Sequence, residues 1–391
     1  MNLLQNTSIM KSKKKLLFYN HTSLVSGAEI SLLEMLSELK DEEFILACPR
    51  GKLSELAIKR GINWVKAPSL DIGFKKNPYY ILLFTVQFIR ACLWVLIFSK
   101  KWRVDLIYAN TIRAGIASIP SFIFGIPTIV HIRDILPEGL FTKLTSYLLV
   151  RFSSALVFNS EFTREKFGIK DKKRTEVIYS PVGYRFFKFI DSKSAKKTMG
   201  IEKRFPVISV IGQIAPWKRI ELAINAVKVI KNKYPDVILL IVGDVVFKGR
   251  KRRLPNELYF ERIKEMVLKE KIEKNVVFMG SREDVEVIMN ASDLVVFTSH
   301  NEPFGRVIGE AMACGVPVLV PEESGIGRII KGKNCGWWFS KEEEIPEKIL
   351  SILGDENLKE KIINEILLSW ALFSPAEILD KIKKLINELA G

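Results

Sequence analysis

Short, continuous runs of apolar residues alternate with longer stretches of helical periodicity along the whole of this 391-residue chain. Continuous Val, Ile, Leu and Phe runs are typical of parallel strands that helices cover on both faces, and a repeated strand–helix order indicates a doubly wound α/β architecture. The predicted strands are Leu16–Asn20, Phe44–Pro49, Asp105–Asn110, Thr128–Arg133, Ala155–Ser160, Glu176–Ser180, Val207–Gly212, Val237–Asp244, Val276–Gly280, Leu294–Ser299 and Pro317–Val320.

The chain is too long for one ordinary hydrophobic core, so two domains are expected. The predicted break lies between Tyr184 and Phe205, where the sequence is rich in lysine and has no strong apolar periodicity. We therefore predict two Rossmann-like domains, at residues 1–186 and 200–374, followed by an amphipathic helix over Pro375–Leu389.

The positive charge is concentrated in the N-terminal half. Residues 1–200 contain 31 Lys and Arg against 16 Asp and Glu, a net +15, whereas residues 201–391 have a net +1. This bias predicts a polyanionic partner for the first half, such as anionic lipid, a phosphorylated acceptor or nucleic acid, and the alternative is a solvated basic surface. A second basic run, Lys248–Arg253, motivates the nucleic-acid alternative, but no stacking aromatic pattern accompanies it, and no nucleic-acid partner is expected.

Cysteine and histidine are sparse. The four cysteines are far apart and the three histidines form no metal-binding pattern, so neither a disulfide framework nor a zinc site is predicted. The basic run Lys11–Lys15 is followed by only about five apolar residues, too few for the core of a signal peptide. These features favour a cytoplasmic location.

The segment Tyr79–Phe98 is mostly apolar and long enough to cross a membrane. Asn77 and Pro78 before it are typical of a helix cap and first turn. Arg90 in its middle disfavours a membrane span, so we expect a buried helix of the first domain. A helix resting on a bilayer is the alternative, because Lys75, Lys76, Lys100, Lys101 and Arg103 flank the segment.

The residues after the predicted strand Leu294–Ser299 form the densest candidate site. A helix is expected from about Phe304-Gly305 to Cys314, and its free N–H groups would suit a phosphate. Glu302 and Glu310 are good acceptors for sugar hydroxyls, although an ordinary capped helix with two surface glutamates would look the same. Two other loops are weaker candidates for ligand binding, Gly212–Arg219 and Ser26–Glu29. Each loop contains small residues and comes after a predicted strand.

In their order along the chain and in their amino-acid sequences, these segments resemble the retaining glycosyltransferases of family 4, which have the GT-B fold. The resemblance covers almost the whole chain, and it is carried by V-S-G-A-E-I-S-L-L-E, V-H-I-R-D, G-Q-I-A-P-W-K, A-S-D-L-V-V-F-T-S and E-P-F-G-R-V-I-G-E-A-M-A-C-G-V-P-V. It implies two domains that face a central cleft, with the last helix, residues 375–391, crossing back onto the first domain.

By this resemblance Glu302 and Glu310 match the family's E-x7-E element, near the donor sugar and the ribose, and His131 matches an active-site histidine. Lys218 matches a diphosphate-binding lysine. Gln213 stands where the family has arginine, and Arg219 and Arg306 are the candidates to supply the missing cation. The implied donor contacts are Gly27, Gln213, Lys218, Arg219, Pro303, Phe304, Gly305, Arg306, Val307 and Glu310, and the implied acceptor contacts are Glu29, Arg133 and Asp134.

The implied reaction moves a sugar from a UDP- or GDP-sugar to an acceptor glycan with retention of configuration. No cofactor is expected, and no metal, since the chain contains no D-x-D triplet. The basic first half points to a polyprenyl-linked acceptor and to a peripheral position on the cytoplasmic face of an anionic membrane. A nucleotide-sugar epimerase or hydrolase on the same scaffold is the enzymatic alternative.

Overall fold

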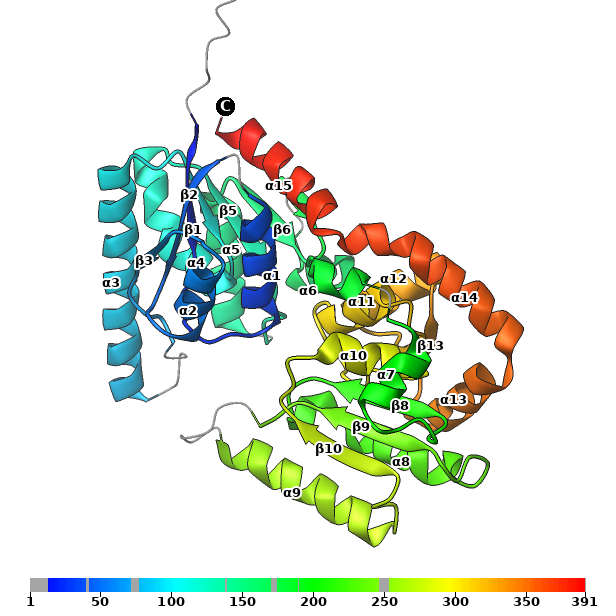
Figure 1. Cartoon of the computed structure of the whole chain (residues 1–391). Coiled ribbons are helices and arrows are strands. Elements are labelled where there is room, and N and C mark those ends of the chain that lie inside the picture. Colours follow the sequence, from blue (N-terminus) through cyan, green and yellow to red (C-terminus); the bar gives the residue numbers. More distant parts are fainter. Residues whose placement is uncertain are drawn as a thin grey trace, which may run out of the picture. The chain divides into compact units, whose positions relative to one another are not determined.

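The computed structural model describes residues 13–39, 42–71, 77–137, 139–169, 174–188, 190–245 and 253–390 (Figure 1). They divide into two units. The first comprises the described parts of Met1–Phe158, Ile169–Glu176 and Leu379–Gly391, and the second comprises those of Asn159–Gly168 and Val177–Ile378. The basic run Lys248–Arg253 lies outside the described residues except for its last member, as do Lys11, Lys75 and Lys76.

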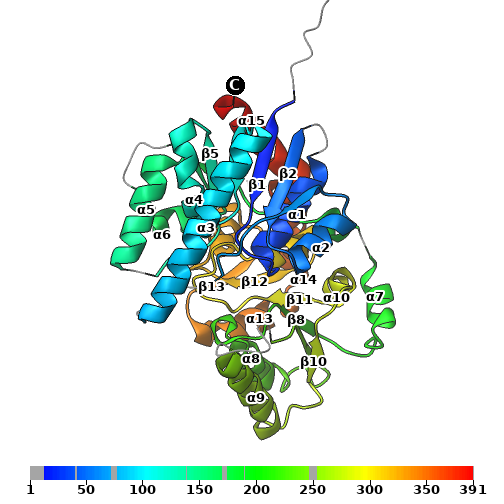
Figure 2. The same cartoon turned by 90° about the vertical axis from the view of Figure 1, so that its left-hand side faces the viewer.

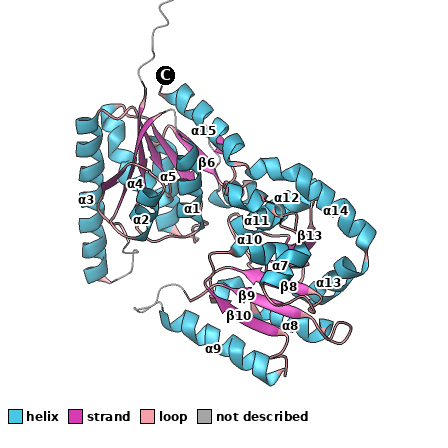
Figure 3. Ribbon diagram, viewed as in Figure 1, coloured by secondary structure: helices cyan, strands magenta, loops and turns pink. Residues whose placement is uncertain are grey.

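Within the described residues, the sheet of the first unit has seven strands in the order β3-β2-β1-β4-β5-β6-β7, and its pairs from β3 to β6 are parallel. Helix α3 lies on one side of this sheet and α1 on the other (Figures 1 and 3). The strands are β1 (Lys15–Tyr19), β2 (Glu43–Cys48), β3 (Trp64–Lys66), β4 (Leu106–Ala109), β5 (Thr128–Ile132), β6 (Ala155–Phe158) and β7 (Thr175–Val177). The helices are α1 (Gly27–Glu38), α2 (Lys52–Lys59), α3 (Pro78–Trp102), α4 (Ile112–Ser118), the 3₁₀ turn η1 (Ile119–Phe124) and α5 (Leu140–Phe152).

The sheet of the second unit has the order β10-β9-β8-β11-β12-β13, and all its pairs are parallel. Its strands are β8 (Val207–Ile211), β9 (Ile238–Val242), β10 (Val276–Gly280), β11 (Leu294–Val296), β12 (Val318–Pro321) and β13 (Trp337–Phe339). The other elements are α6 (Glu161–Phe167), η2 (Tyr184–Phe187), α7 (Ser192–Thr198), η3 (Pro216–Lys218), α8 (Glu221–Ile230), α9 (Arg253–Lys269), α10 (Val285–Ala291), α11 (Arg306–Ala313), α12 (Gly325–Lys333), η4 (Glu342–Glu344), α13 (Ile345–Gly354), α14 (Glu356–Ser369), η5 (Trp370–Phe373) and α15 (Pro375–Leu389).

Two buried clusters hold the second sheet between its helices. On one face α8, α9 and α13 pack against side chains such as Ile208, Leu239 and Val296. On the other face α11 and α12 pack against Val295, Val318 and neighbouring side chains. Burial on both faces accounts for the continuous apolar runs in the sequence.

Every predicted strand overlaps an observed one, whereas β3 and β13 were not predicted. Both have three residues, stand at sheet edges and are only partly buried, so they leave little apolar pattern to detect. The predicted boundary at residue 186 also differs from the division observed, because α6 and the residues from Val177 group with the second unit. Helix α15 begins in the second unit, and its residues from Leu379 belong to the first, where Arg174 pairs with Glu388.

Helix α3 begins as predicted: the Asn77 side chain accepts a hydrogen bond from Tyr79 N, and Pro78 occupies the first turn. The expectation that it is buried is wrong. One face packs on the unit through Ala91, Cys92 and Val95, but only 17% of its most apolar 18-residue window is buried. Figure 2 shows α3 running across the outside of the first unit. Within the described residues, this segment, Tyr79–Trp102, and Glu356–Leu389 are long and apolar enough to cross a membrane by length and composition.

Candidate active site

An ion pair joins two predicted donor-site residues of the second unit. Lys218 at the end of η3 places Nζ 2.9 Å from Glu302 Oε2, and Thr298 Oγ1 donates to the Lys218 carbonyl at 2.6 Å. A small pocket at the carboxyl ends of β8 and β11 is lined by Gly212, Gln213, Lys218, Phe297, Thr298 and Ser299. The structure therefore gathers two separate sequence signals at one edge of the sheet, where open α/β sheets bind ligands.

Two glycines allow the strand-end loops to touch behind this pocket. A Cβ on Gly243, whose φ is +141°, would lie 1.8 Å from the Gly212 carbonyl oxygen. The next residue, Gln213, has a buried Nε2 without a hydrogen-bond partner among the described residues. An unsatisfied buried donor costs about 1–3 kcal/mol, so an acceptor atom on a ligand would stabilise it.

The loop between β11 and α11 is held by its backbone. The Pro303 carbonyl accepts hydrogen bonds from Ser160 Oγ at 2.5 Å and Thr163 Oγ1 at 3.1 Å, and the Glu302 carbonyl accepts one from Gly325 N at 3.0 Å. These bonds tie the loop to the first turns of α6 and α12. They fix Glu302 beside the first turn of α11, where Ile308 N donates to the Gly305 carbonyl at 2.9 Å and the earlier N–H groups have no acceptor within the helix.

Two residues of this loop, Gly305 and Phe304, pack inside the second unit. Gly305, one of the implied donor contacts, has a φ of +90°, and an added Cβ would lie 2.8 Å from Ile326 Cγ2 inside the unit. The Phe304 ring is 3% exposed, stacks on Tyr179 and meets Phe373 edge to face, so only its backbone is available to a donor. Val307 is half-buried against the same cluster.

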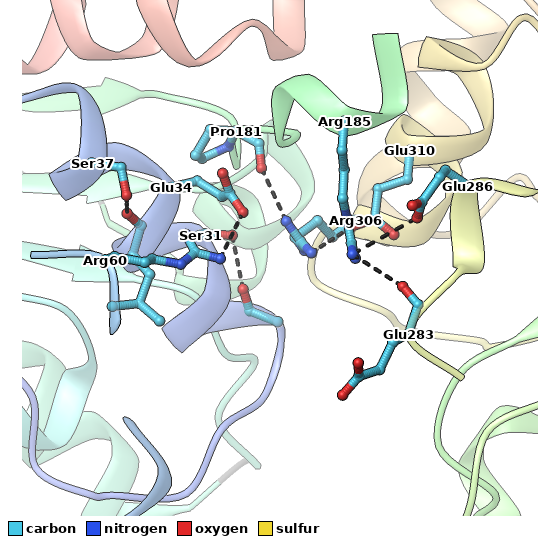
Figure 4. A network of polar contacts seen from close by, with 12 residues as sticks. Ser31, Glu34, Ser37, Arg60, Pro181, Arg185, Glu283, Glu286, Arg306 and Glu310 are labelled. Atoms are coloured by element: carbon cyan, nitrogen blue, oxygen red, sulfur yellow. Dashed lines mark hydrogen bonds and ion pairs between the residues drawn. The ribbon is translucent and has the colours of Figure 1, made fainter. Parts of the chain in front are cut away.

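Helix α11 carries a buried ion pair. Arg306 pairs with Glu310 one turn later and also donates to the Pro181 carbonyl at 3.4 Å (Figure 4). Glu310 is only 6% exposed. Arg219 has a positive φ and pairs with Glu342. Both arginines that were considered as replacements for a cation at position 213 are therefore engaged with carboxylates.

In the first unit, His131 on β5 is 1% exposed, and its Nδ1 lies 2.5 Å from the Tyr108 hydroxyl. Burial, together with the nearby Arg133 guanidinium, holds the pKa of His131 well below its usual range. The imidazole is therefore neutral at pH 7. Its Nε2 has no hydrogen-bond partner among the described residues, which leaves one ring nitrogen available to a substrate.

A chain of hydrogen bonds runs across the carboxyl ends of β5, β4 and β1. Arg133 Nε donates to Asn110, Asn110 to Asn20, and Asn20 to Glu29 at 3.4 Å. Glu29 is 3% exposed and accepts from Ser26 N and Ser26 Oγ in a capping box. In this structure Glu29 thus caps α1 and joins the polar chain, so its expected contact with an acceptor remains a prediction.

Gly27 and Asp134, the other predicted residues of this unit, are accessible. Gly27 begins α1, and a Cβ there would meet nothing within 4 Å. The fold therefore does not require glycine at position 27, which leaves room for a ligand. Asp134 is exposed just after β5.

Tyr108, Ser160, Thr163 and Thr298 were not singled out from the sequence. Ser160 ends a predicted strand, and Thr298 belongs to the string A-S-D-L-V-V-F-T-S that carries the family resemblance. Within the described part of the chain, no three His, Cys, Asp or Glu side chains are placed to hold a metal ion.

Residues 191–366 match the family model described as Glycosyl transferases group 1. This stretch, which lies in the second unit, is similar to the group 1 glycosyltransferases. The crystal structure of Anabaena Alr3699/HepE in complex with UDP and glucose is 24% identical, covers 96% of this chain and 99% of the other, and superposes with a TM-score of 0.79. This likeness confirms the GT-B fold with two Rossmann-like domains.

Two curated relatives of this chain differ in how much of each sequence the match covers. N-acetyl-alpha-D-glucosaminyl L-malate synthase of Bacillus anthracis is 28% identical over 49% of this chain and 47% of its own length. UDP-Gal:alpha-D-GlcNAc-diphosphoundecaprenol alpha-1,3-galactosyltransferase of Escherichia coli is 24% identical over 74% of this chain and 77% of its own. The chain thus spans about half the length of several curated relatives that it matches.

Proposed function

We propose that this protein transfers a sugar from a nucleotide diphosphate sugar to an acceptor glycan with retention of configuration. The proposal rests on one observation. Lys218, which lines the same pocket as Gln213, pairs with Glu302, and Glu302 lies just before the first turn of α11. A cation and free N–H groups suit a diphosphate, and carboxylates suit sugar hydroxyls.

The proposed reaction needs the protein mainly to position its substrates. The acceptor oxygen bonds to the anomeric carbon on the face from which the nucleotide diphosphate leaves. The bond between that carbon and the phosphate oxygen breaks, and the acceptor proton passes to the leaving phosphate. Lys218 and the helix N–H groups stabilise the charge that develops on the diphosphate. HepE, with UDP and glucose in its crystals, favours UDP as the nucleotide.

Calorimetric titration with UDP and GDP tests the donor site. Replacing Lys218 with Ala removes a charge-assisted contact and should weaken binding about 10- to 100-fold, since such bonds contribute about 1.5–3 kcal/mol. Lys228→Ala is the matched control, because Lys228 also pairs with a glutamate of this unit, Glu270, at 2.6 Å. Equal affinities of Lys218→Ala and the wild type would refute the assignment. The anomeric configuration of the product, measured by NMR, tests retention.

The acceptor is proposed to be lipid-linked, and the protein to be peripheral on the cytoplasmic face of the membrane. The solvent-facing side of α3 supports this, because Leu82, Val86, Ile89, Leu93 and Ile97 are 45–66% exposed there. At i, i+4, i+7, i+11 and i+15 they form one stripe along the helix. Exposed apolar surface beside excess positive charge suits an anionic bilayer. The Escherichia coli relative named above for a diphosphoundecaprenol acceptor agrees with this class.

Vesicle flotation tests the membrane proposal. The wild type should float with vesicles that contain anionic lipid, and a triple variant, Leu82→Ser, Ile89→Ser and Leu93→Ser, should not. The control variant Leu258→Ser, Leu268→Ser changes leucines of α9 that are 60% and 61% exposed and should float like the wild type. Absence of wild-type flotation, with or without anionic lipid, would refute the proposal.

A further inference from the structure

A basic pocket lies beside α3 in the first unit, at the carboxyl ends of β2 and β3. We propose that this pocket binds the diphosphate of a lipid-linked acceptor, with the lipid chain along the exposed stripe of α3. The inference rests on the proposed function and assigns it an acceptor subsite.

The pocket has a volume of about 420 Å³ and is lined by Pro49, Arg50, Lys66, Ala67, Pro68, Ser69, Gln87 and Arg90. Its three cations, Arg50, Lys66 and Arg90, come from three separate elements or loops. None of their side chains forms a hydrogen bond or ion pair with another described residue. Lysine and arginine side chains at protein surfaces are commonly stabilised by nearby carboxylates. Three such side chains without a carboxylate partner in one pocket therefore indicate an anionic ligand.

Carboxylates are scarce around this pocket. The sequence from Ile72 to Val104, which includes all of α3, contains no Asp or Glu. Asp71 accepts a hydrogen bond from Ser69 at the edge of the pocket, and the Arg113 guanidinium donates to the Asp71 carbonyl at 3.3 Å. One carboxylate therefore faces three lining cations and a fourth nearby, which leaves a net positive site.

The pocket and the apolar stripe share one helix. Gln87 and Arg90 line the pocket, and Ile89 and Leu93 of the stripe are neighbours of Arg90 on α3. At about 100° per residue, positions 87 and 90 fall between the stripe and the face that packs on the unit. A molecule with a charged head and a long apolar tail fits this arrangement, because its two ends need the two kinds of surface side by side.

The pocket also lies at the same sheet edge as His131. Strands β2, β1, β4 and β5 are parallel neighbours, so their carboxyl ends share one edge, about 14 Å from β2 to β5 at the usual strand spacing. A glycan attached to a diphosphate in the pocket would extend along this edge toward the unpartnered Nε2 of His131.

Binding of farnesyl diphosphate, inorganic diphosphate and farnesol to the full-length protein tests the inference. Farnesyl diphosphate should bind at least tenfold more tightly than either other probe, because only it offers both the anion and the chain. The double variant Arg50→Gln, Arg90→Gln should lose at least tenfold in affinity for it. Arg60→Gln is the matched control, since Arg60 pairs with Glu34 in the same unit, and it should bind like the wild type (Figure 4).

The outcomes separate this inference from the proposed function. Affinity for UDP, measured on the same samples, should be unchanged in the double variant, and thermal unfolding should confirm that all variants fold. Farnesyl diphosphate binding that is absent, insensitive to the double variant or equally lowered by Arg60→Gln would overturn the pocket assignment. Equal affinity for inorganic diphosphate would overturn the role of the lipid chain. If the wild type bound neither UDP nor GDP, the proposed function alone would be overturned.

Discussion

At the scale of single residues, two glycines that a sequence motif would treat alike have opposite structural roles. Gly305 has a positive φ and lies against Ile326, so the fold itself requires it. Gly27 begins α1 in open space, so the fold tolerates a side chain there. The difference between the two positions arises from neighbours that are distant in sequence. It can be measured as a difference in the free energy of unfolding when each glycine is replaced with alanine.

Gly305→Ala should lower the free energy of unfolding by about 2–4 kcal/mol, from left-handed backbone strain and overpacking together. Gly27→Ala should leave it unchanged or raise it by up to about 1 kcal/mol, because alanine is the better helix former. Under the proposed function Gly27→Ala should still slow sugar transfer. Chemical denaturation measures the first two effects, and a stable Gly305→Ala variant would contradict the packing argument.

At the scale of secondary-structure elements, the loop that carries Glu302 depends on a helix from another part of the sequence. Ser160 is fully buried, accepts a hydrogen bond from Thr163 N as the cap of α6 and donates to the Pro303 carbonyl. Arg328 of α12 pairs with Glu165 of α6 nearby. Helix α6 thus supports the candidate donor site although it follows a strand of the other unit.

Ser160→Ala should lower the free energy of unfolding by about 1–3 kcal/mol, since both a cap and a buried hydrogen bond are lost. It should also weaken UDP binding several-fold, because the loop loses its anchor. Asp191→Ala removes the cap of α7 in the same unit. It should lower the free energy of unfolding without changing the affinity for UDP. If Ser160→Ala bound UDP like the wild type, the loop would be held without α6.

At the scale of the whole molecule, two buried histidines lead us to expect that the two units differ in how their stability depends on pH. His21 and His131 both belong to the first unit. Burial is the largest cause that lowers the pKa of His21 to about 4, with a further contribution from Arg113, and burial lowers that of His131 well below the usual 6.5. Both are neutral when folded, whereas the unfolded chain takes up protons below about pH 6.5.

The stability that these histidines contribute is therefore complete above about pH 6.5 and is lost as the pH falls toward 4. The slope is about 1.4 kcal/mol per pH unit for each histidine. Calorimetry of the full chain should show the transition of the first unit shifting to lower temperature faster than that of the second. His21→Gln should reduce this slope, and parallel shifts of both transitions would contradict the prediction.

Sequence patterns by themselves determined the α/β class, the two Rossmann-like units, most strands and the limits of α15, because apolar periodicity is local and is set by burial on both faces of parallel sheets. Together with the family resemblance, they also singled out Lys218, Glu302 and Glu310 as candidate site residues. Only the tertiary structure decided that Lys218 and Glu302 pair, that Gly305 and Phe304 belong to the core, and that α6 holds the Glu302 loop. It also decided that α3 exposes an apolar face, since exposure depends on which neighbours pack against a helix, and a sequence window does not contain them.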